Sequence, residues 1–192
     1  MGRSTFELAK GFALADGLDY STRFIETANE IRAQGQIAYD LKEEGDLASR
    51  RTRSLADLGL DFTATRVAFH QGNAQDLPDA LDRYDLVFAG NLIDRLPDPR
   101  SFLTAIHERM NPGGLLVLTS PYTWLSDFTP KENWLGGYTR DGTPVSTIDG
   151  LKETLAHRFD CLESEREVPF VIRETRRKFQ HTVASLTAWR LR

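Results

Sequence analysis

The stretch YDLVFAGNLIDRLPDP, residues 84–99, decides the fold class of this chain. Its first seven residues form an almost continuous apolar run after a Tyr-Asp start, which is typical of a central parallel strand covered on both faces. Asn91 follows the run directly. The pattern therefore predicts a buried strand over residues 84–90 with a polar side chain at its carboxyl end.

The segments on either side alternate between the two periodicities. Apolar spacing and capping residues predict helices over residues 4–12, 20–35, 99–110 and 147–158, and short apolar runs predict strands over residues 13–19, 66–71, 115–121, 162–168 and 182–190. Residues 36–61 carry clustered charges and are interpreted as an insertion with an edge strand and a short helix. This order predicts a doubly wound α/β sheet whose last two strands are antiparallel partners.

Composition narrows the class of protein. The 192 residues are 40% hydrophobic and 27% charged, and no repeat, low-complexity segment or linker is visible, so we expect one domain over residues 1–192. A net charge of -4 argues against nucleic-acid or anionic-membrane partners and favours a small-molecule substrate. Cys161 is the single cysteine, and neither metal-ligand spacing, a membrane span nor a signal peptide is apparent, so we expect a soluble, cytoplasmic protein without a metal.

Polar residues follow several of the predicted strands. In open α/β sheets, ligands bind outside the carboxyl ends of the strands. Asp19 is placed to accept hydrogen bonds from ribose hydroxyls, and Asn73 with Ala74 to contact an adenine edge, while Asn91 is placed to face the other end of a ligand. Each also has an ordinary interpretation: a first-turn helix acid for Asp19, a simple turn for Asn73, and a turn cap for Asn91.

Taken together, the acid after the second strand, the Gly-Asn-Ala after the third, YDLVF, and NPGGLLVLTSP resemble the class I S-adenosylmethionine-dependent methyltransferases over nearly the whole chain. The resemblance implies a Rossmann-like sheet of order 3-2-1-4-5-7-6 with an antiparallel last strand. It also implies S-adenosylmethionine as the cofactor, bound by Gly2, Arg3, Asp19, Tyr20, Asn73, Ala74, Asn91 and Leu92.

Three longer stretches are similar to the mercaptohistidine N-methyltransferases of ovothiol biosynthesis: residues 84–99, SPYTWLSDFTPKENWLGG (120–137) and PFVIRETRRKFQHT (169–182). The implied reaction is methylation of an imidazole nitrogen of 5-thiohistidine. Such domains also form the C-terminal part of ovothiol synthases, so a sulfur-inserting synthase is an expected partner. A methyltransferase with another acceptor is the alternative within the same class.

The chemistry of thiohistidine suggests which side chains bind it. In-line displacement at a sulfonium needs alignment and a dry site rather than a covalent nucleophile, and no general base is assigned. An aromatic lid is expected from Tyr122, Trp124, Phe128 and Trp134, with Gly136 and Gly137 as hinges, and donors or acceptors for the amino-acid part from Arg173, Glu174, Arg176, Arg177 and Lys178. If residues 172–178 are extended, Arg173 and Arg177 share one side. The ordinary interpretations are a hydrophobic cap on the core and a solvated charged loop.

The amino terminus, MGRSTFELAK, resembles the second half of the family's cofactor turn, D/E-x-G-x-x-x-G, with Gly2 in the place of the last glycine. The strand before that turn would be the first central strand, and we expect it to be missing from this chain. We further expect that Met1 is not the natural start and that a GTG valine codon was read as an initiator. Sequencing upstream in frame tests this. The rival expectation is a truncated, inactive domain that serves as an interaction module.

Overall fold

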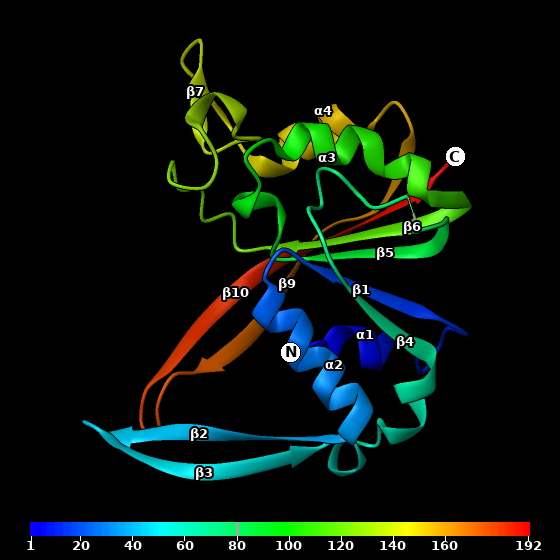
Figure 1. The fold of residues 1–192 in the computed structure, drawn as a ribbon. Helices are drawn as coiled ribbons and strands as arrows, with labels where there is room; N and C mark the ends of the chain where they lie inside the picture. Colours follow the sequence, from blue (N-terminus) through cyan, green and yellow to red (C-terminus); the bar gives the residue numbers. More distant parts are fainter. Residues whose placement is uncertain (80) are drawn as a thin grey trace. The chain divides into compact units, whose positions relative to one another are not determined.

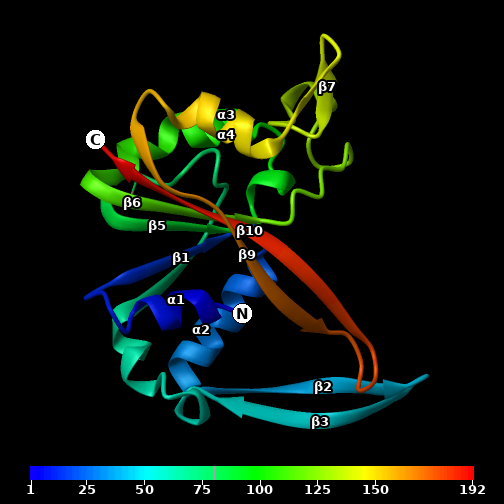
Figure 2. The ribbon, with the colours of Figure 1, turned by 180° about the vertical axis from the view of Figure 1, so that it is seen from behind.

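The computed structural model describes residues 1–79 and 81–192. Its chain forms two compact units (Figures 1 and 2): unit 1 comprises Met1–Pro78 and Arg173–Phe179, and unit 2 comprises Asp79–Ile172 and Gln180–Arg192. None of the helices in the described residues is long and apolar enough to cross a membrane.

Unit 1 is built on a pair of parallel strands with two helices packed against it. The elements are α1 (Arg3–Leu8), β1 (Ala15–Asp19), α2 (Thr22–Gln34), β2 (Gln36–Glu44), β3 (Leu47–Ser54) and β4 (Val67–Gln71), with 3-10 turns at Ala56–Leu58 and Asp61–Arg66. β1 and β4 pair in parallel from Ala15↔Val67 to Asp19↔Gln71. β1, β4 and α2 lie close to their predicted bounds, whereas α1 ends at Leu8, earlier than the predicted end at Phe12.

The ends of α2 follow from local chemistry. Ser21 caps the helix by accepting a hydrogen bond from the Phe24 N–H at 3.4 Å, and Gly35 ends it with a φ of 70°. Ile25, Ala28 and Ile31 form the buried face, which packs on β4. The helix therefore closes the core of unit 1, whose buried members are Phe6, Ala9, Ile25, Ala28, Ile31, Leu55, Leu60, Val67 and Phe69.

The insertion after α2 differs from its prediction. Instead of one edge strand and a helix, residues 36–54 form an antiparallel hairpin of β2 and β3, followed by the two 3-10 turns at Ala56–Leu58 and Asp61–Arg66. Gly45, with a φ of 52°, and Asp46 make a two-residue turn between the strands. Because most of these side chains are exposed, burial imposes little alternation and the charged second strand gave only a weak strand signal.

Unit 2 contains the longer sheet and the remaining helices. The elements are β5 (Tyr84–Gly90), α3 (Pro99–Ala105), β6 (Met110–Ser120), β7 (Tyr138–Arg140), β8 (Thr143–Val145), α4 (Thr147–Leu155), β9 (Phe159–Arg173) and β10 (Phe179–Leu191), with 3-10 turns at Ile93–Arg95, Ile106–Arg109 and Lys131–Asn133. α3 and α4 pack on each other (Figure 1). Fully buried side chains of this core include Leu103, Met110, Leu116, Leu118, Leu151, Leu155 and Trp189.

The strand order matches the predicted fold class. The larger sheet has the order β5-β6-β10-β9, with β5 parallel and β10 antiparallel to β6. β1 and β4 form a separate pair. In the order 3-2-1-4-5-7-6 that the resemblance implies, the larger sheet corresponds to strands 4-5-7-6 and the separate pair to strands 2 and 3. None of the described residues forms a strand that corresponds to strand 1. The Rossmann-like α/β fold with an antiparallel last strand is confirmed.

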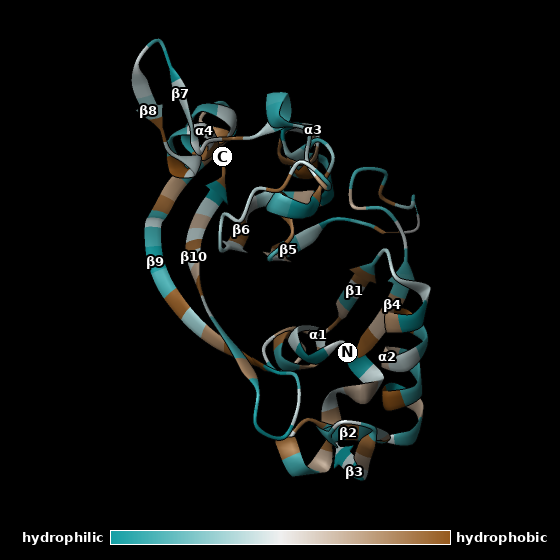
Figure 3. Ribbon diagram, turned by 90° about the vertical axis from the view of Figure 1, so that its left-hand side faces the viewer, coloured by the Kyte–Doolittle hydropathy of each residue, from teal (hydrophilic) through white to brown (hydrophobic). Residues whose placement is uncertain are grey.

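Several element bounds differ from their predictions. α3 and α4 end earlier than predicted, at Ala105 and Leu155, and α3 continues as a 3-10 turn. The last two strands are longer and run into the charged segment. Figure 3 shows bands of hydrophilic and hydrophobic residues along β9, whose side chains are mostly exposed. A long exposed ribbon leaves its ends without the burial pattern on which sequence-based bounds depend.

Candidate functional site

The carboxyl ends of β1 and β4 bring predicted cofactor residues together in unit 1. Asp19 is the last residue of β1, and its register partner Gln71 ends β4. The Gly72 N–H donates to the Asp19 carbonyl oxygen at 3.1 Å, which holds the loop after β4 beside the acid. Asp19 Oδ1 accepts from the Ser21 N–H at 2.8 Å. Its Oδ2 has no protein partner within residues 1–79 and 81–192, so the exposed carboxylate keeps an acceptor for a ligand.

The structure gives less support for ligand binding by the neighbouring residues Tyr20, Asn73 and Ala74. Tyr20 is 77% exposed. Asn73 Oδ1 accepts from the Gln75 N–H at 3.0 Å, and the Asp76 N–H donates to the Asn73 carbonyl oxygen at 3.0 Å. Asn73 thus caps its own turn, as the ordinary interpretation of the sequence has it. Ala74 lies half-buried within that turn.

Gly2 sits where no larger residue fits. Its φ is 67°, and an added Cβ would lie 2.7 Å from the ring of Phe69 and 3.2 Å from the Cβ of Ala28. A glycine is therefore required both by the left-handed backbone and by the close approach of α1 to β4. Arg3 is exposed and donates to the Glu7 carboxylate at 2.8 and 2.6 Å. That hydrogen bond is the main reason why the pKa of Glu7 lies below its ordinary value, with a second contribution from Lys10.

In unit 2, two non-glycine residues with left-handed backbone follow adjacent strands. Asn91, with a φ of 52°, comes directly after β5, and Tyr122, with a φ of 53°, lies just beyond β6. The Asn91 N–H donates to the Thr119 carbonyl oxygen at 2.7 Å, and its Oδ1 accepts from Thr119 Oγ1 at 3.3 Å. Such backbone strain clusters at ligand sites, which supports the carboxyl end of this sheet as the functional end. Leu92, half-buried, follows in the same loop.

A buried ionic network that the sequence analysis missed joins the loops after β5 and β6. Asp94 is 1% exposed, and its Oδ2 accepts from Thr123 Oγ1 at 2.9 Å and pairs with Arg95 at 3.2 Å. Arg95 also donates to the Thr123 carbonyl oxygen at 2.9 Å and lies over the Phe128 ring at 4.9 Å. The sequence LIDRLP could have indicated this network, because its adjacent Asp and Arg are flanked by apolar residues and a buried charge needs a partner.

The predicted aromatic lid is firmly anchored to α4. Trp124 is buried and its Nε1 donates to Thr147 Oγ1 at 2.9 Å, which agrees with the interpretation as a cap on the core. Trp134 stacks on Trp124 with ring centroids 6.3 Å apart and donates to the Thr129 carbonyl oxygen at 2.8 Å. An added Cβ on Gly136 would lie 2.2 Å from the backbone of Ser146. Gly136 therefore serves as a close-packing contact, which does not fit the predicted hinge.

The charged segment after β9 is a turn, so the condition under which Arg173 and Arg177 would share one side, an extended segment over residues 172–178, is not met. Arg173 ends β9, and the Arg177 and Lys178 N–H groups donate to Thr175 Oγ1 at 3.3 and 3.1 Å. Arg173 donates to the carbonyl oxygens of Thr175 and Arg176 at 3.1 and 3.3 Å. Its guanidinium therefore holds the turn closed.

The other charges of this segment are paired within unit 1. Lys178 Nζ lies 2.5 Å from a carboxylate oxygen of Glu174. Arg176 pairs with Glu43 of β2 at 3.6 Å, and its N–H donates to the Lys42 carbonyl oxygen at 2.9 Å. A hydrogen bond from Ser49, with the charges of Arg176 and Arg51, lowers the pKa of Glu43. The segment thus docks on the hairpin, and the assignment of Arg173, Glu174, Arg176 and Lys178 to substrate binding stays a prediction.

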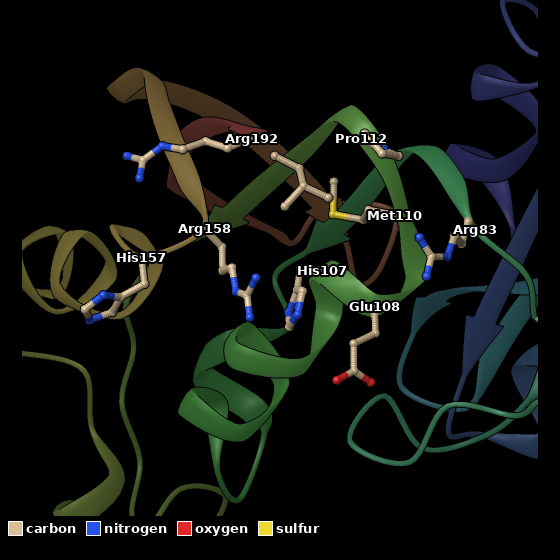
Figure 4. A pocket seen from close by; sticks show the side chains of 9 residues that line it. Arg83, His107, Glu108, Met110, Pro112, His157, Arg158 and Arg192 are labelled. Carbon is tan, nitrogen blue, oxygen red and sulfur yellow. The ribbon is translucent and has the colours of Figure 1, made fainter.

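Two cavities of unit 2 are lined by residues that the structure describes. One of about 320 Å³ lies near the amino end of β6, and Figure 4 shows the Arg158 guanidinium beside His107, with Arg83 coming from a separate stretch of chain. The other, of about 430 Å³, lies at the carboxyl end of β6 and is lined by Ser120, Pro121, Tyr122, Glu165, Arg166, Glu167, Val183 and Ser185. Because ligands of open α/β sheets bind at the carboxyl end, the second cavity is the better substrate candidate.

Comparison with known proteins is consistent with this geometry. The family described as "Methyltransferase domain" matches residues 50–143. A ubiquinone biosynthesis O-methyltransferase from Cereibacter sphaeroides is 27% identical over 115 residues, covering 56% of this chain and 47% of that protein. A trans-aconitate 2-methyltransferase from Deinococcus radiodurans is 30% identical over 122 residues, covering 51% of this chain and 46% of that protein. The chain spans about half the length of these curated relatives.

A solved structure extends the similarity in fold to nearly the whole chain. An S-adenosylmethionine-dependent methyltransferase from Methanosarcina mazei superimposes with a TM-score of 0.56 at 15% identity, covering 96% of this chain and 85% of that one. At this identity the likeness shows the fold alone, and the sequence matches add the relationship. Together, the matches show that this chain is similar to S-adenosylmethionine-dependent methyltransferases in fold and, over about half of its length, to methyltransferases in sequence.

Proposed function

We propose that this protein transfers a methyl group from S-adenosylmethionine to a small-molecule acceptor. The observation that carries the proposal is the gathering of polar and strained residues at the carboxyl ends of the strands, in unit 1 at Asp19 and in unit 2 at Asn91 and Tyr122. The bound cofactor supplies an electrophilic methyl group on a sulfonium sulfur. The protein then contributes binding, alignment and exclusion of water.

The residues in place suit such a cofactor. Asp19 keeps Oδ2 for the ribose hydroxyls, since only Oδ1 accepts from the Ser21 N–H. Asn73 has a side-chain NH2 group without a partner in the described part of the chain, which suits a ring nitrogen of adenine. Asn91 would face the amino-acid end. In this assignment Gly2, Arg3, Tyr20, Ala74 and Leu92 complete the contacts.

The finer proposal is that the acceptor is an imidazole nitrogen of 5-thiohistidine. Its support is the similarity of three stretches, residues 84–99, 120–137 and 169–182, to mercaptohistidine N-methyltransferases. Tyr122, Trp124 and Trp134 would contact the ring. The four assigned residues of the turn after β9 would have to exchange their present ion pairs for the substrate's charged groups. A sulfur-inserting partner and a cytoplasmic location belong to the same proposal.

A hydroxyl acceptor is the second candidate. It is favoured by the relatives named as ubiquinone biosynthesis O-methyltransferases, which match about half of this chain. Both candidates share the cofactor and differ only in the attacking atom, so one set of assays separates them.

Two measurements test the proposal. Calorimetry with S-adenosylmethionine should show binding to the 192-residue chain, strongly weakened in Asp19→Ala and unchanged in the control Asp46→Ala, whose carboxylate lies in the exposed turn between β2 and β3. Methyl transfer is then measured with 5-thiohistidine, histidine and a catechol. Turnover of thiohistidine but not histidine supports the finer proposal, and turnover of the catechol alone supports the hydroxyl acceptor. Absence of cofactor binding would favour an interaction module instead.

A further inference from the structure

A chain of three side chains runs along the wall of the larger cavity in unit 2. Tyr122 Oη lies 3.2 Å from Ser185 Oγ, and Ser185 Oγ lies 3.0 Å from Glu165 Oε1. The three residues come from the loop after β6, from β10 and from β9, and all of them line the cavity of about 430 Å³. Neither the sequence motifs nor the cofactor assignment accounts for this alignment.

The direction of the hydrogen bonds follows from the chemistry of the last member. An ionised carboxylate only accepts, so Ser185 must donate its proton to Glu165. Ser185 Oγ then accepts from Tyr122, whose single O–H is committed to this bond. The lone pairs of Tyr122 Oη are consequently free to accept a proton from a molecule in the cavity. Both hydroxyl hydrogens, those of Tyr122 and Ser185, therefore point from the cavity toward Glu165.

The backbone holds the first member rigidly in place. Tyr122 has a φ of 53°, and its N–H donates to Ser120 Oγ at 3.0 Å. Ser120 and Ser185 are register partners in the pairing of β6 and β10, so the strand register itself sets the distance between the loop and the serine. Maintaining a strained backbone in this way is typical of functional sites.

The two ends of the chain have different environments. Burial, reinforced by the charge of Glu165, raises the pKa of the Tyr122 phenol, while the bond to Ser185 opposes that rise. The phenol therefore stays neutral near pH 7 and cannot act as an anionic base. Glu165 is exposed, next to Arg166 and Glu167, the other charged groups that line the cavity, and can release a proton to water.

We propose that Tyr122, Ser185 and Glu165 form a proton relay that deprotonates the attacking atom of an acceptor bound in this cavity. The inference rests on the proposed methyl transfer and assigns its acceptor to molecules with an O–H or N–H at the attacking atom. A lone pair of that atom forms the bond to the methyl carbon, and the S–CH3 bond breaks with its electron pair left on sulfur. The acceptor's proton moves to Tyr122, that of Tyr122 to Ser185, and that of Ser185 to Glu165.

Kinetics of three variants test the role of the relay. Tyr122→Phe, Ser185→Ala and Glu165→Gln should each lower kcat by about 100-fold, because a positioned proton acceptor typically contributes a factor of this order. The KM for S-adenosylmethionine should stay unchanged. Glu163→Gln, the same charge change on the same strand, is the control and should behave as the wild type.

A spectroscopic titration tests the hydrogen-bond chain without turnover. With ¹³C-labelled tyrosine, the signal lost in Tyr122→Phe reports the phenol. Ser185→Ala should raise its pKa by removing the hydrogen bond, and Glu165→Gln should lower it by removing the nearby charge. A Tyr122 signal that ignores both substitutions would overturn the relay.

The two levels of proposal fail in different ways. If the wild type binds no cofactor and methylates none of the three acceptors, the proposed function falls and the relay falls with it. If the wild type turns over and Tyr122→Phe keeps kcat within about threefold of it, only the relay is refuted. Loss of kcat in all three variants with an intact control and shifted titrations supports it.

Discussion

Replacing Gly150 by Ala should destabilise unit 2, although alanine is the better helix former. Gly150 lies in α4 and faces the backbone of Leu135, where an added Cβ would come within 1.9 Å of the carbonyl oxygen. Because ordinary contact begins at 3.4 Å, the helix and the loop would have to separate by roughly 1.5 Å in a tightly packed interior. Leu135 is fully buried, so the loop has no free space to enter.

The magnitude follows from two opposing effects. Overpacking against backbone belongs at the upper end of the usual range, about 3 kcal/mol. The helix propensity of alanine offsets about 1 kcal/mol of this. The free energy of unfolding should therefore fall by about 2 kcal/mol, which corresponds to a Tm lower by roughly 4–8 °C. The shift should also disturb the hydrogen bond from Trp124 to Thr147, at 2.9 Å in the wild type.

Urea unfolding followed by circular dichroism and tryptophan fluorescence measures this change. The control is Gly11→Ala, where an added Cβ would have no neighbour closer than 3.9 Å and the stability should change by less than about 0.5 kcal/mol. A Gly150→Ala protein as stable as the wild type would refute the reasoning, because it would mean that α4 does not seat against Leu135 as closely as the structure shows.

Three further outcomes are expected. Arg95→Ala should cost about 2–4 kcal/mol in denaturant unfolding by leaving the buried Asp94 unpaired, and adding Asp94→Asn should recover part of that loss. Hydrogen bonds from Ser146, the cap of α4, lower the pKa of Asp149 in the folded protein. Their contribution to stability is therefore present above the pKa of the unfolded state and is lost as the pH falls through the lower pKa of the folded state. Asp149→Asn should reduce this loss of stability at acid pH, and an unchanged loss would contradict the assignment. Glu43→Gln should speed hydrogen exchange at the Arg176 N–H, and unchanged exchange would show that the ion pair does not hold the turn on the hairpin.

Apolar periodicity and capping residues predicted most of the helices and strands, because both depend on residues that are close together in the sequence. The capped helix that ends at Gly35 and a strand over residues 84–90 both form where expected. The prediction that this strand is central and covered on both faces is wrong, because β5 is the edge strand of its sheet and Ala89 is its one buried residue. The hairpin at residues 36–54 was missed because exposed strands lack the alternation that burial imposes. Its Gly45-Asp46 turn was the local signal that could have revealed it.

The candidate site was predictable only in part. Asp19 and Asn91 each lie at the carboxyl end of a strand within their own unit, as predicted, because a polar residue after a short apolar run marks the end of a strand. The pairing of Asp94 with Arg95, and the closure of the turn by Arg173, depend on which groups burial and folding bring together. No spacing rule distinguishes these from charges that stay in water.

By itself, the sequence determined the fold class, the mostly parallel direction of the strands and the family resemblance, because these depend on periodicity and on short motifs. Only the tertiary structure aligned Tyr122 with Ser185 and Glu165, residues that are 63 and 20 positions apart in their respective pairs. The register of β6 on β10 sets that alignment, and a shift of one residue would turn Ser185 to the other face. Register is decided by the packing of the whole sheet, so the relay emerges only in the folded chain.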